Sequence, residues 1–273
     1  MTVGEALKQL RSQLGLTQEQ MAAGIISESY YSKVERDLHV IDAKSLIMIL
    51  KVHDIDMSNF FNILRHQNIS DKDKEYDLRA QIVVAQNRKD LKALDKIASK
   101  IYNNGFQPSF DLQRRLENAY VWITHSNEHV SPQIKRGVKN QIMTKKWGTQ
   151  TYYLLSQSII MFDIDTAYQL ADKAFRSYEE KHFNNIYILI FVANLAINFL
   201  NCCYHYHGKR EYIDRALDFL RNSLPKNDAI GINNILGTYY EALFNDDKKT
   251  TQMIIKILDK SGYLSLIEDT LEN

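Results

Sequence analysis

The first 66 residues carry hydrophobic side chains at helical spacing in five short segments. Thr17 and Gln20 have the spacing of a capping box, in which two side chains satisfy free backbone groups at the start of a helix. Three later segments follow other good helix caps, namely Ser27, Asp42 and either Asp56 or Ser58. The pattern predicts a bundle of five short helices. Its interior is expected to include Met21, Ile25, Tyr31, Val34, Leu46, Ile47, Ile49 and Leu50, and the fifth helix is expected to contain Phe60, Phe61 and Leu64.

Beyond this bundle, a polar stretch is followed by a long series of helical segments. Residues 67–75 hold few large apolar side chains and are expected to form a linker. Residues 76–273 alternate apolar helical stretches with short breaks, which predicts paired helices in a TPR-like helical-repeat solenoid. The expected helices are about 75–103, 110–127, 132–146, 148–161, 163–180, 183–206, 209–223, 228–244 and 247–270.

Composition supports an all-α fold and excludes several classes of protein. The 273 residues include only 10 Gly and 3 Pro, too few for an all-β chain with many tight turns. Cys202 and Cys203 are the only cysteines, so no disulfide framework is expected and a cytoplasmic location fits best. The N-terminus is too polar for a signal peptide. The apolar run 186–200 contains two Asn and is too short to span a bilayer comfortably, so we interpret it as a core helix and expect no membrane association.

A helix, a tight turn and a second helix between residues 16 and 36 have the arrangement of the DNA-reading helix-turn-helix unit. The amide of Gln18 is placed to reach a phosphate, and Lys33 and Arg36 to neutralise phosphates or contact guanine edges. Arg11 and Glu35 are expected to form an internal ion pair. The predicted DNA-binding residues are Gln18, Ser27, Glu28, Ser29, Tyr30, Ser32, Lys33 and Arg36.

Charge gives this interpretation no support of its own. Residues 1–66 hold seven Lys or Arg and eight Asp or Glu, a net charge of −1, and the whole chain has a net charge of +1. A dimer that places two such units on one duplex, and phosphate binding at helix N-termini, offset this deficit. The alternative is that the small bundle makes protein contacts and the chain is a helical-repeat adaptor.

The sequence resembles a known family of regulators over nearly its whole length. "RSQLGLTQEQMA" and "SESYYSKVER" resemble the lambda-repressor-like helix-turn-helix of the Xre family. The turn "GIIS" is one residue shorter than usual, as in the Rgg/MutR (Rgg/GadR/MutR) family of transcriptional regulators. "KKWGTQTYYLLSQSIIMFDIDTAYQLADKAF" at residues 145–175 resembles the Trp-Gly segment of that family. "IFVANLAINFLNCC", "REYIDRALDFL" and "GTYYEALF" resemble its later helices.

This resemblance implies a cytoplasmic, homodimeric transcriptional regulator that binds double-stranded DNA. It also implies that the repeat domain both dimerises and binds a short signalling peptide of the quorum-sensing type. A regulator with a small-molecule ligand, or with none, is the other possibility that keeps DNA binding.

A polar stripe on the apolar helix predicted at 183–206 is the candidate peptide site. Tyr187, Asn194, Asn198, Asn201 and His205 are spaced by seven, four, three and four residues, which places them on one face. Asn amides both donate and accept hydrogen bonds, so a row of them can hold an extended peptide backbone. The same Asn could instead bond neighbouring helices or face water. The predicted contacts are Tyr187, Asn194, Asn198, Asn201, Asn233, Asn234 and Arg79. The resemblance implies a preference for Asn194, because peptide regulators of this group use an Asn on an inner repeat helix.

Catalytic chemistry is not expected. The sequence has no phosphate-binding Gly loop, zinc motif or nucleophile elbow, so we predict a protein that is not an enzyme and has no cofactor or metal. Cys202 and Cys203 precede two His at 205 and 207, but positions on one helix seldom converge on one ion in this way.

Overall fold

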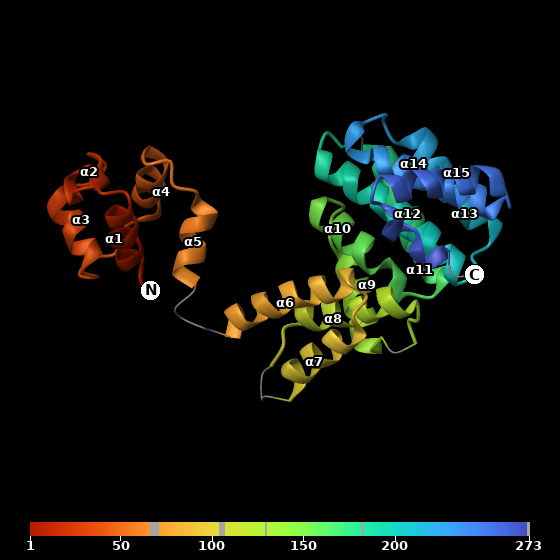
Figure 1. The fold of residues 1–273 in the computed structure, drawn as a ribbon, viewed down its shortest axis with the longest axis horizontal. Helices are drawn as coiled ribbons and strands as arrows, with labels where there is room; N and C mark the ends of the chain where they lie inside the picture. The colour runs from red at the N-terminus through yellow and green to blue at the C-terminus, as the bar shows by residue number, and fades with distance from the viewer. Residues whose placement is uncertain (66–70, 104–106, 129, 182, 272–273) are drawn as a thin grey trace. The chain divides into compact units, whose positions relative to one another are not determined.

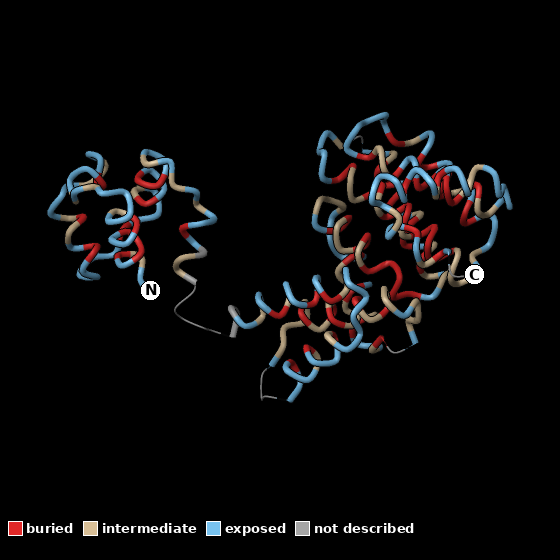
Figure 2. The backbone as a smooth tube through the Cα atoms, viewed as in Figure 1, coloured by how far each residue is buried: buried red, intermediate tan, exposed pale blue. Residues whose placement is uncertain are grey.

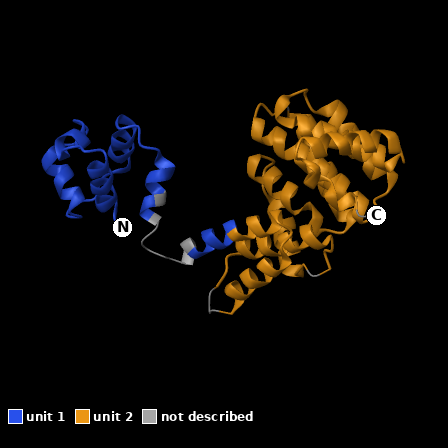
Figure 3. Cartoon of the chain, in the orientation of Figure 1, with its two compact units in different colours: residues 1–80 blue, residues 81–273 orange. Residues whose placement is uncertain are grey.

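The computed structural model describes residues 1–65, 71–103, 107–128, 130–181 and 183–271, and every regular element among them is helical (Figure 1). Two compact units divide the chain, Met1–Ala80 and Gln81–Asn273 (Figure 3). The predicted all-α class is confirmed, with a five-helix N-terminal bundle and a TPR-like helical-repeat region.

The first unit contains the five predicted helices, and their caps explain where they begin. The Thr17 hydroxyl accepts from the Gln20 backbone N–H, and the Gln20 side chain accepts from the Thr17 N–H. Ser27, Asp42 and Asp56 each accept a backbone N–H three residues later. The helices are α1 (Val3–Gln13), α2 (Gln18–Ala22), α3 (Glu28–Glu35), α4 (Ala43–Val52) and α5 (Met57–Arg65).

A small core joins these helices. Its fully buried side chains include Leu7, Met21, Tyr31, Ile49 and Phe60. Gly4 lets α1 approach the end of α3, because a Cβ there would overlap the Val34 carbonyl oxygen. The inward placement predicted for Ile47 is wrong, because its side chain is exposed, as is that of Phe61. Each lies next to a buried neighbour, and one turn of a short helix presents only part of its circumference to the core.

The second unit is a succession of helices, and many of them pack on the next helix in the chain. Contacts join α7 to α8, α8 to α9, α9 to α10 and α10 to α11. The helices of this part of the chain, of which α6 begins in the first unit, are α6 (Asp71–Asn87), α7 (Leu91–Tyr102), α8 (Phe110–Thr124), α9 (Pro132–Thr144), α10 (Thr149–Ser158), α11 (Ile164–Lys181), α12 (Ile186–His205), α13 (Arg210–Asp218), α14 (Gly231–Phe244) and α15 (Lys248–Lys260). A π-helical turn, Phe219–Ser223, extends α13.

Helix α12 is the centre of the second unit. It contacts α10, α11, α13 and α14, and most of its length is buried (Figure 2). By length and composition it is the one helix among the described residues that could cross a membrane, but 67% of its apolar window is buried inside the fold. Cys202 and Cys203 are free thiols in this buried helix. Burial raises the pKa of both, that of Cys203 to about 12.

Two predicted helices differ from the observed ones. The helix expected at 75–103 is broken between α6 and α7, where Lys89 has a φ of 51° and Asp90 caps α7 through the Ala93 N–H. The helix expected at 247–270 ends at Lys260, and Gly262 follows with a φ of 76°. Two short 3-10 turns, Leu264–Leu266 and Glu268–Thr270, then complete the chain's described part.

The predicted linker falls partly outside the described residues. Its positions 67–70 are not described, whereas residues 71–75 form the first turns of α6. The division into compact units falls further along α6, after Ala80. The domain limits expected from the sequence therefore stay a prediction.

Candidate functional site

The first candidate site is the outer face of α3, which follows α2 after a tight turn. Ala23 and Gly24 turn the chain with φ values of 49° and 69°. Ser29, Lys33 and Arg36 are exposed and follow one another at helical spacing of four and three residues, so they form one stripe. Glu28 is exposed beside them, and Ser32 is half-buried.

Four of the predicted DNA-binding residues bond other groups of the unit through their side chains: Gln18, Ser27, Tyr30 and Arg36, whose Nε donates to the Ser32 carbonyl at 3.2 Å. The Ser27 hydroxyl caps α3 by accepting the Tyr30 backbone N–H at 3.2 Å. The Tyr30 hydroxyl donates to the Val40 carbonyl at 2.9 Å, and its ring stacks on His39. These bonds orient the start of α3 and the segment that follows it, whereas the predicted DNA contacts themselves stay predictions.

A buried carboxylate fixes α1, α2 and α3 to one another. Glu35 is 5% exposed and accepts from Arg11 Nε at 2.6 Å and Nη2 at 3.2 Å, which confirms the predicted ion pair. Gln18 Nε2 also donates to Glu35, at 2.7 Å. Burial raises the pKa of Glu35, but the hydrogen bonds from Arg11 and Gln18 outweigh it and leave the pKa below its ordinary value. The Gln18 amide, predicted to reach a phosphate, thus holds the two helices of the turn together.

Replacing Glu35 with Gln is expected to destabilise the first unit by about 2 kcal/mol at pH 7, because it removes one partner of a partly buried ion pair. A carboxylate with a lowered pKa stabilises the fold above its unfolded pKa, and this contribution is lost as pH falls through the folded pKa. The difference between the variant and the wild type should therefore shrink in acid. Urea unfolding followed by circular dichroism measures it, with exposed Glu28→Gln on the same helix as the control. An equal loss for both variants at pH 7 would contradict the role of Glu35.

The second candidate site is a cavity of about 570 Å³ in the second unit. Its walls come from five places: the α6–α7 turn, the end of α8, the middle of α12, α14 and the 3-10 turns after α15. An ion pair between Lys89 Nζ and Glu268 Oε2, 3.0 Å apart, joins the first of these walls to the last. The lining residues include Gln86, Asn87, Arg88, Lys89, Trp122, His125, Ile197, Asn198, Asn201, Tyr240, Leu266, Glu268 and Asp269.

Two residues of the predicted polar stripe line this cavity. Asn198 Nδ2 donates to the Ser156 carbonyl at 2.9 Å. Asn201 is 5% exposed, and its Nδ2 donates to the Tyr240 hydroxyl at 2.9 Å and to Asp269 Oδ2 at 2.6 Å. Part of the stripe therefore bonds neighbouring helices, which was the alternative interpretation of the sequence.

The other predicted peptide contacts lie away from the cavity walls. Asn233 Nδ2 donates to Asn194 Oδ1 at 2.8 Å, so this pair joins α14 to α12. Tyr187 is exposed at the start of α12, and Asn234 lines a separate hollow of about 210 Å³ beside the π-helical turn. Arg79 pairs with Glu75 at 3.0 Å in the first unit. Their roles in ligand binding stay predictions.

Of the residues that line the cavity, the sequence predicted only Asn198 and Asn201 as contacts. The segments 86–89 and 265–269 were expected inside continuous helices, so their side chains were not considered. The signals for the two breaks are the helix cap Asp90 and the Ser-Gly pair at 261–262.

A helix-turn-helix unit followed by a helical-repeat unit is the class of fold that carries these two sites, and comparisons with known proteins agree. Residues 7–60 match the helix-turn-helix family. No curated protein sequence matches the chain.

Solved structures share the fold over the full length. The SHP pheromone receptor Rgg2(C45S) of Streptococcus dysgalactiae is 16% identical with a TM-score of 0.59, and the match covers 100% of each chain. PlcR of Bacillus thuringiensis in complex with the peptide PapR7 and DNA is 18% identical, with a TM-score of 0.55, over 100% of this chain and 99% of that one. The PrgX/cCF10 complex is 18% identical, with a TM-score of 0.53 and 99% coverage of both chains. The resemblance to Rgg-type regulators is thus confirmed at the level of the fold and of the helix-turn-helix domain.

Proposed function

We propose that this protein is a DNA-binding transcriptional regulator controlled by a short signalling peptide. The observation that carries the proposal is the full-length fold likeness to receptors of that kind, one of them solved with both peptide and DNA. The helix-turn-helix match at residues 7–60 supports the DNA-binding half independently.

DNA reading is assigned to α3. Its exposed stripe of Ser29, Lys33 and Arg36 suits insertion into the major groove, with the two cations near phosphates or guanine edges. The Glu35 cluster supports this role, because a recognition helix fixed to α1 and α2 presents its side chains in one geometry. A cytoplasmic homodimer would place two α3 helices on paired half-sites. It would thereby double the modest attraction between the cations of α3 and the DNA phosphates.

Peptide binding is assigned to the cavity of the second unit, which has the size and the mixed polar and apolar lining of a ligand site. Asn198 and the side chains of the α6–α7 turn offer amide and cationic groups to a peptide backbone or carboxylate. Because separate segments of the chain form the walls, a ligand that bridges them favours one arrangement of the helices. Regulation follows if that arrangement has a different affinity for DNA.

The decisive experiment selects genomic fragments of the host with purified full-length protein, with and without the peptide fraction of spent culture medium. Enrichment of fragments that carry paired half-sites is expected, together with a change in enrichment when the peptide fraction is present. Folded protein that enriches no fragment at low salt in either condition would overturn the proposal and favour a helical-repeat adaptor. Enrichment that does not change with the peptide fraction would contradict control by a peptide and leave the DNA-binding part of the proposal standing.

Replacing Asn198 with Ala is expected to raise the concentration of peptide fraction needed for half of the response by about tenfold, since one or two hydrogen bonds to the ligand are lost. Asn127→Ala is the matched control, because Asn127 is also half-buried and donates Nδ2 to a backbone carbonyl, that of Phe162, but does not line the cavity. The measurement is fluorescence anisotropy of an enriched DNA fragment. An equal change in both variants would refute the placement of the peptide in this cavity.

A further inference from the structure

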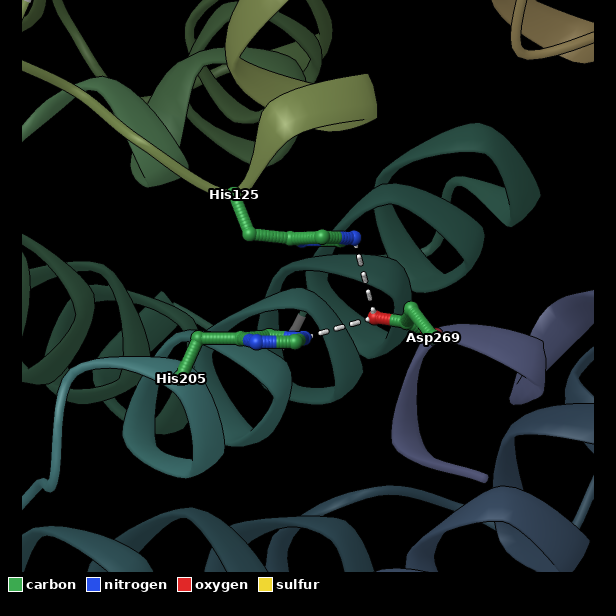
Figure 4. A group of neighbouring side chains, drawn as sticks. All are labelled: His125, His205 and Asp269. Carbon is green, nitrogen blue, oxygen red and sulfur yellow. Dashed lines mark hydrogen bonds and ion pairs between the residues drawn. The ribbon is translucent and has the colours of Figure 1, made fainter. Parts of the chain in front are cut away.

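Two imidazoles and a carboxylate meet beside the cavity, and two of the three side chains, His125 and Asp269, line it. His125 follows α8, His205 ends α12, and Asp269 lies in the last 3-10 turn (Figure 4). The Nε2 atom of His205 lies 2.8 Å from Asp269 Oδ2, and that of His125 lies 3.8 Å from the same oxygen. The two rings stack with centroids 3.9 Å apart and planes 9° from parallel. Three distant parts of the chain thus bring three ligand atoms within 4.8 Å of one another.

This donor set is one that transition metals prefer. Imidazole nitrogens with one carboxylate bind zinc and its first-row neighbours, whereas calcium and magnesium select oxygen ligands. Ligand atoms around a tetrahedral zinc ion lie about 3.3 Å apart, given bonds of about 2.0 to 2.1 Å. The two measured separations, 2.8 and 3.8 Å, lie on either side of that value. All three ligand atoms lie within 4.8 Å of one another, so they can reach one ion if the stacked rings tilt apart to aim their nitrogens at it.

The surroundings of the cluster favour a bound ion over a purely structural hydrogen bond. Asn201 Nδ2 donates to Asp269 Oδ2 at 2.6 Å, the kind of outer bond that orients a metal-bound carboxylate. The Oδ1 atom of Asn201 is buried and has no hydrogen-bond partner in the described structure. His125, Asn201 and Asp269 also line the cavity, which supplies an entry path and room for a fourth ligand.

We propose that His125, His205 and Asp269 bind one divalent transition-metal ion of the zinc class. The ion would join the end of α8, the end of α12 and the last turn of the chain at one edge of the cavity. It would leave at least one coordination position facing the cavity. This site is independent of whether the cavity binds a peptide, since its three protein ligands come from the chain itself.

The test titrates the full-length, tag-free protein with Co²⁺, which reports its ligands by visible absorption, and then displaces it with Zn²⁺. Wild-type protein is expected to saturate at one ion per chain. His125→Asn and Asp269→Asn should weaken binding by about tenfold or more. His207→Asn is the matched control for His125→Asn, because both positions have a left-handed φ, 51° and 53°, that Asn tolerates. The control should bind as the wild type does.

Two further measurements do not depend on the variants. Zinc should raise the melting temperature of the wild type in a saturable way, since a ligand that binds only the folded state stabilises it. X-ray absorption of the zinc complex should show nitrogen and oxygen ligands with two imidazoles. No saturable binding, unchanged affinity in His125→Asn and Asp269→Asn, or sulfur ligation would each overturn the proposal. In the first case the cluster is a hydrogen-bonded histidine pair that shares one carboxylate.

Discussion

Reversing the charge of Lys33 and Arg36 together is expected to weaken DNA binding by about 100-fold or more. Each residue that contacts a phosphate or a base edge contributes about 1 to 3 kcal/mol, and a Glu in its place adds repulsion from the phosphates. Both side chains lie on the exposed stripe of α3, so the substitutions leave the core of the first unit intact. Fluorescence anisotropy with an enriched DNA fragment, at several salt concentrations, gives the change in Kd.

The matched control reverses two other exposed cations of the same unit, Lys8 on α1 and Lys51 on α4. It changes the net charge by the same amount, so it separates a specific contact from a general loss of attraction. We expect the control to weaken binding by less than about tenfold and the α3 variant also to flatten the salt dependence. If both variants lose the same affinity at every salt concentration, α3 does not read the DNA.

Substituting Gly4 with Ala is expected to destabilise the first unit by about 3 kcal/mol, because the added Cβ must push the backbone of α3 away. Gly4 lies inside α1, and the atom that its Cβ would overlap is the Val34 carbonyl oxygen rather than a flexible side chain. The approach of α1 to α3 also sets the Arg11–Glu35 pair. DNA binding should therefore fall together with stability.

The location of the two Trp makes the effect measurable in one protein. Trp122 and Trp147 both lie in the second unit, so their fluorescence follows that unit, whereas circular dichroism follows both. Gly4→Ala should lower the stability of the first unit, whose unfolding contributes to the dichroism transition but not to the tryptophan fluorescence. Gly231→Ala, where a Cβ meets open space at the start of α14, should change neither signal appreciably. A shift of the tryptophan transition in Gly4→Ala would contradict the assignment of the effect to α1 and α3.

How much of the fold could be predicted depended on how local its signals were. Thr17, Ser27 and Asp42 each bond a backbone group three residues away, so short stretches of sequence were enough to begin α2, α3 and α4 correctly. The Arg11–Glu35 pair was also predicted, since both side chains follow from the helix-turn-helix pattern. The exposure of Ile47 and Phe61 was not, because it depends on which turns of α4 and α5 reach the core.

The candidate cavity depends on longer-range facts. Apolar residues continue at helical spacing through residue 88 and beyond residue 260. Periodicity alone therefore predicted one continuous helix at each place, where the structure has a break. Those two breaks turn Arg88 and Lys89 toward the same space as Glu268 and Asp269. The histidine cluster shows the same limit, because His205 and Asp269 are 64 residues apart and nothing in their spacing links them.

Protected native thiols make this chain convenient for site-directed labelling. Cys202 and Cys203 are enclosed in α12 and ionise only at high pH, so thiol-specific dyes should leave them untouched while the second unit stays folded. A cysteine introduced at exposed Ser29 would then be the only reactive group, with no need for a cysteine-free background. In the unlabelled protein, the rate at which the two native thiols become reactive measures how often the helices around α12 open.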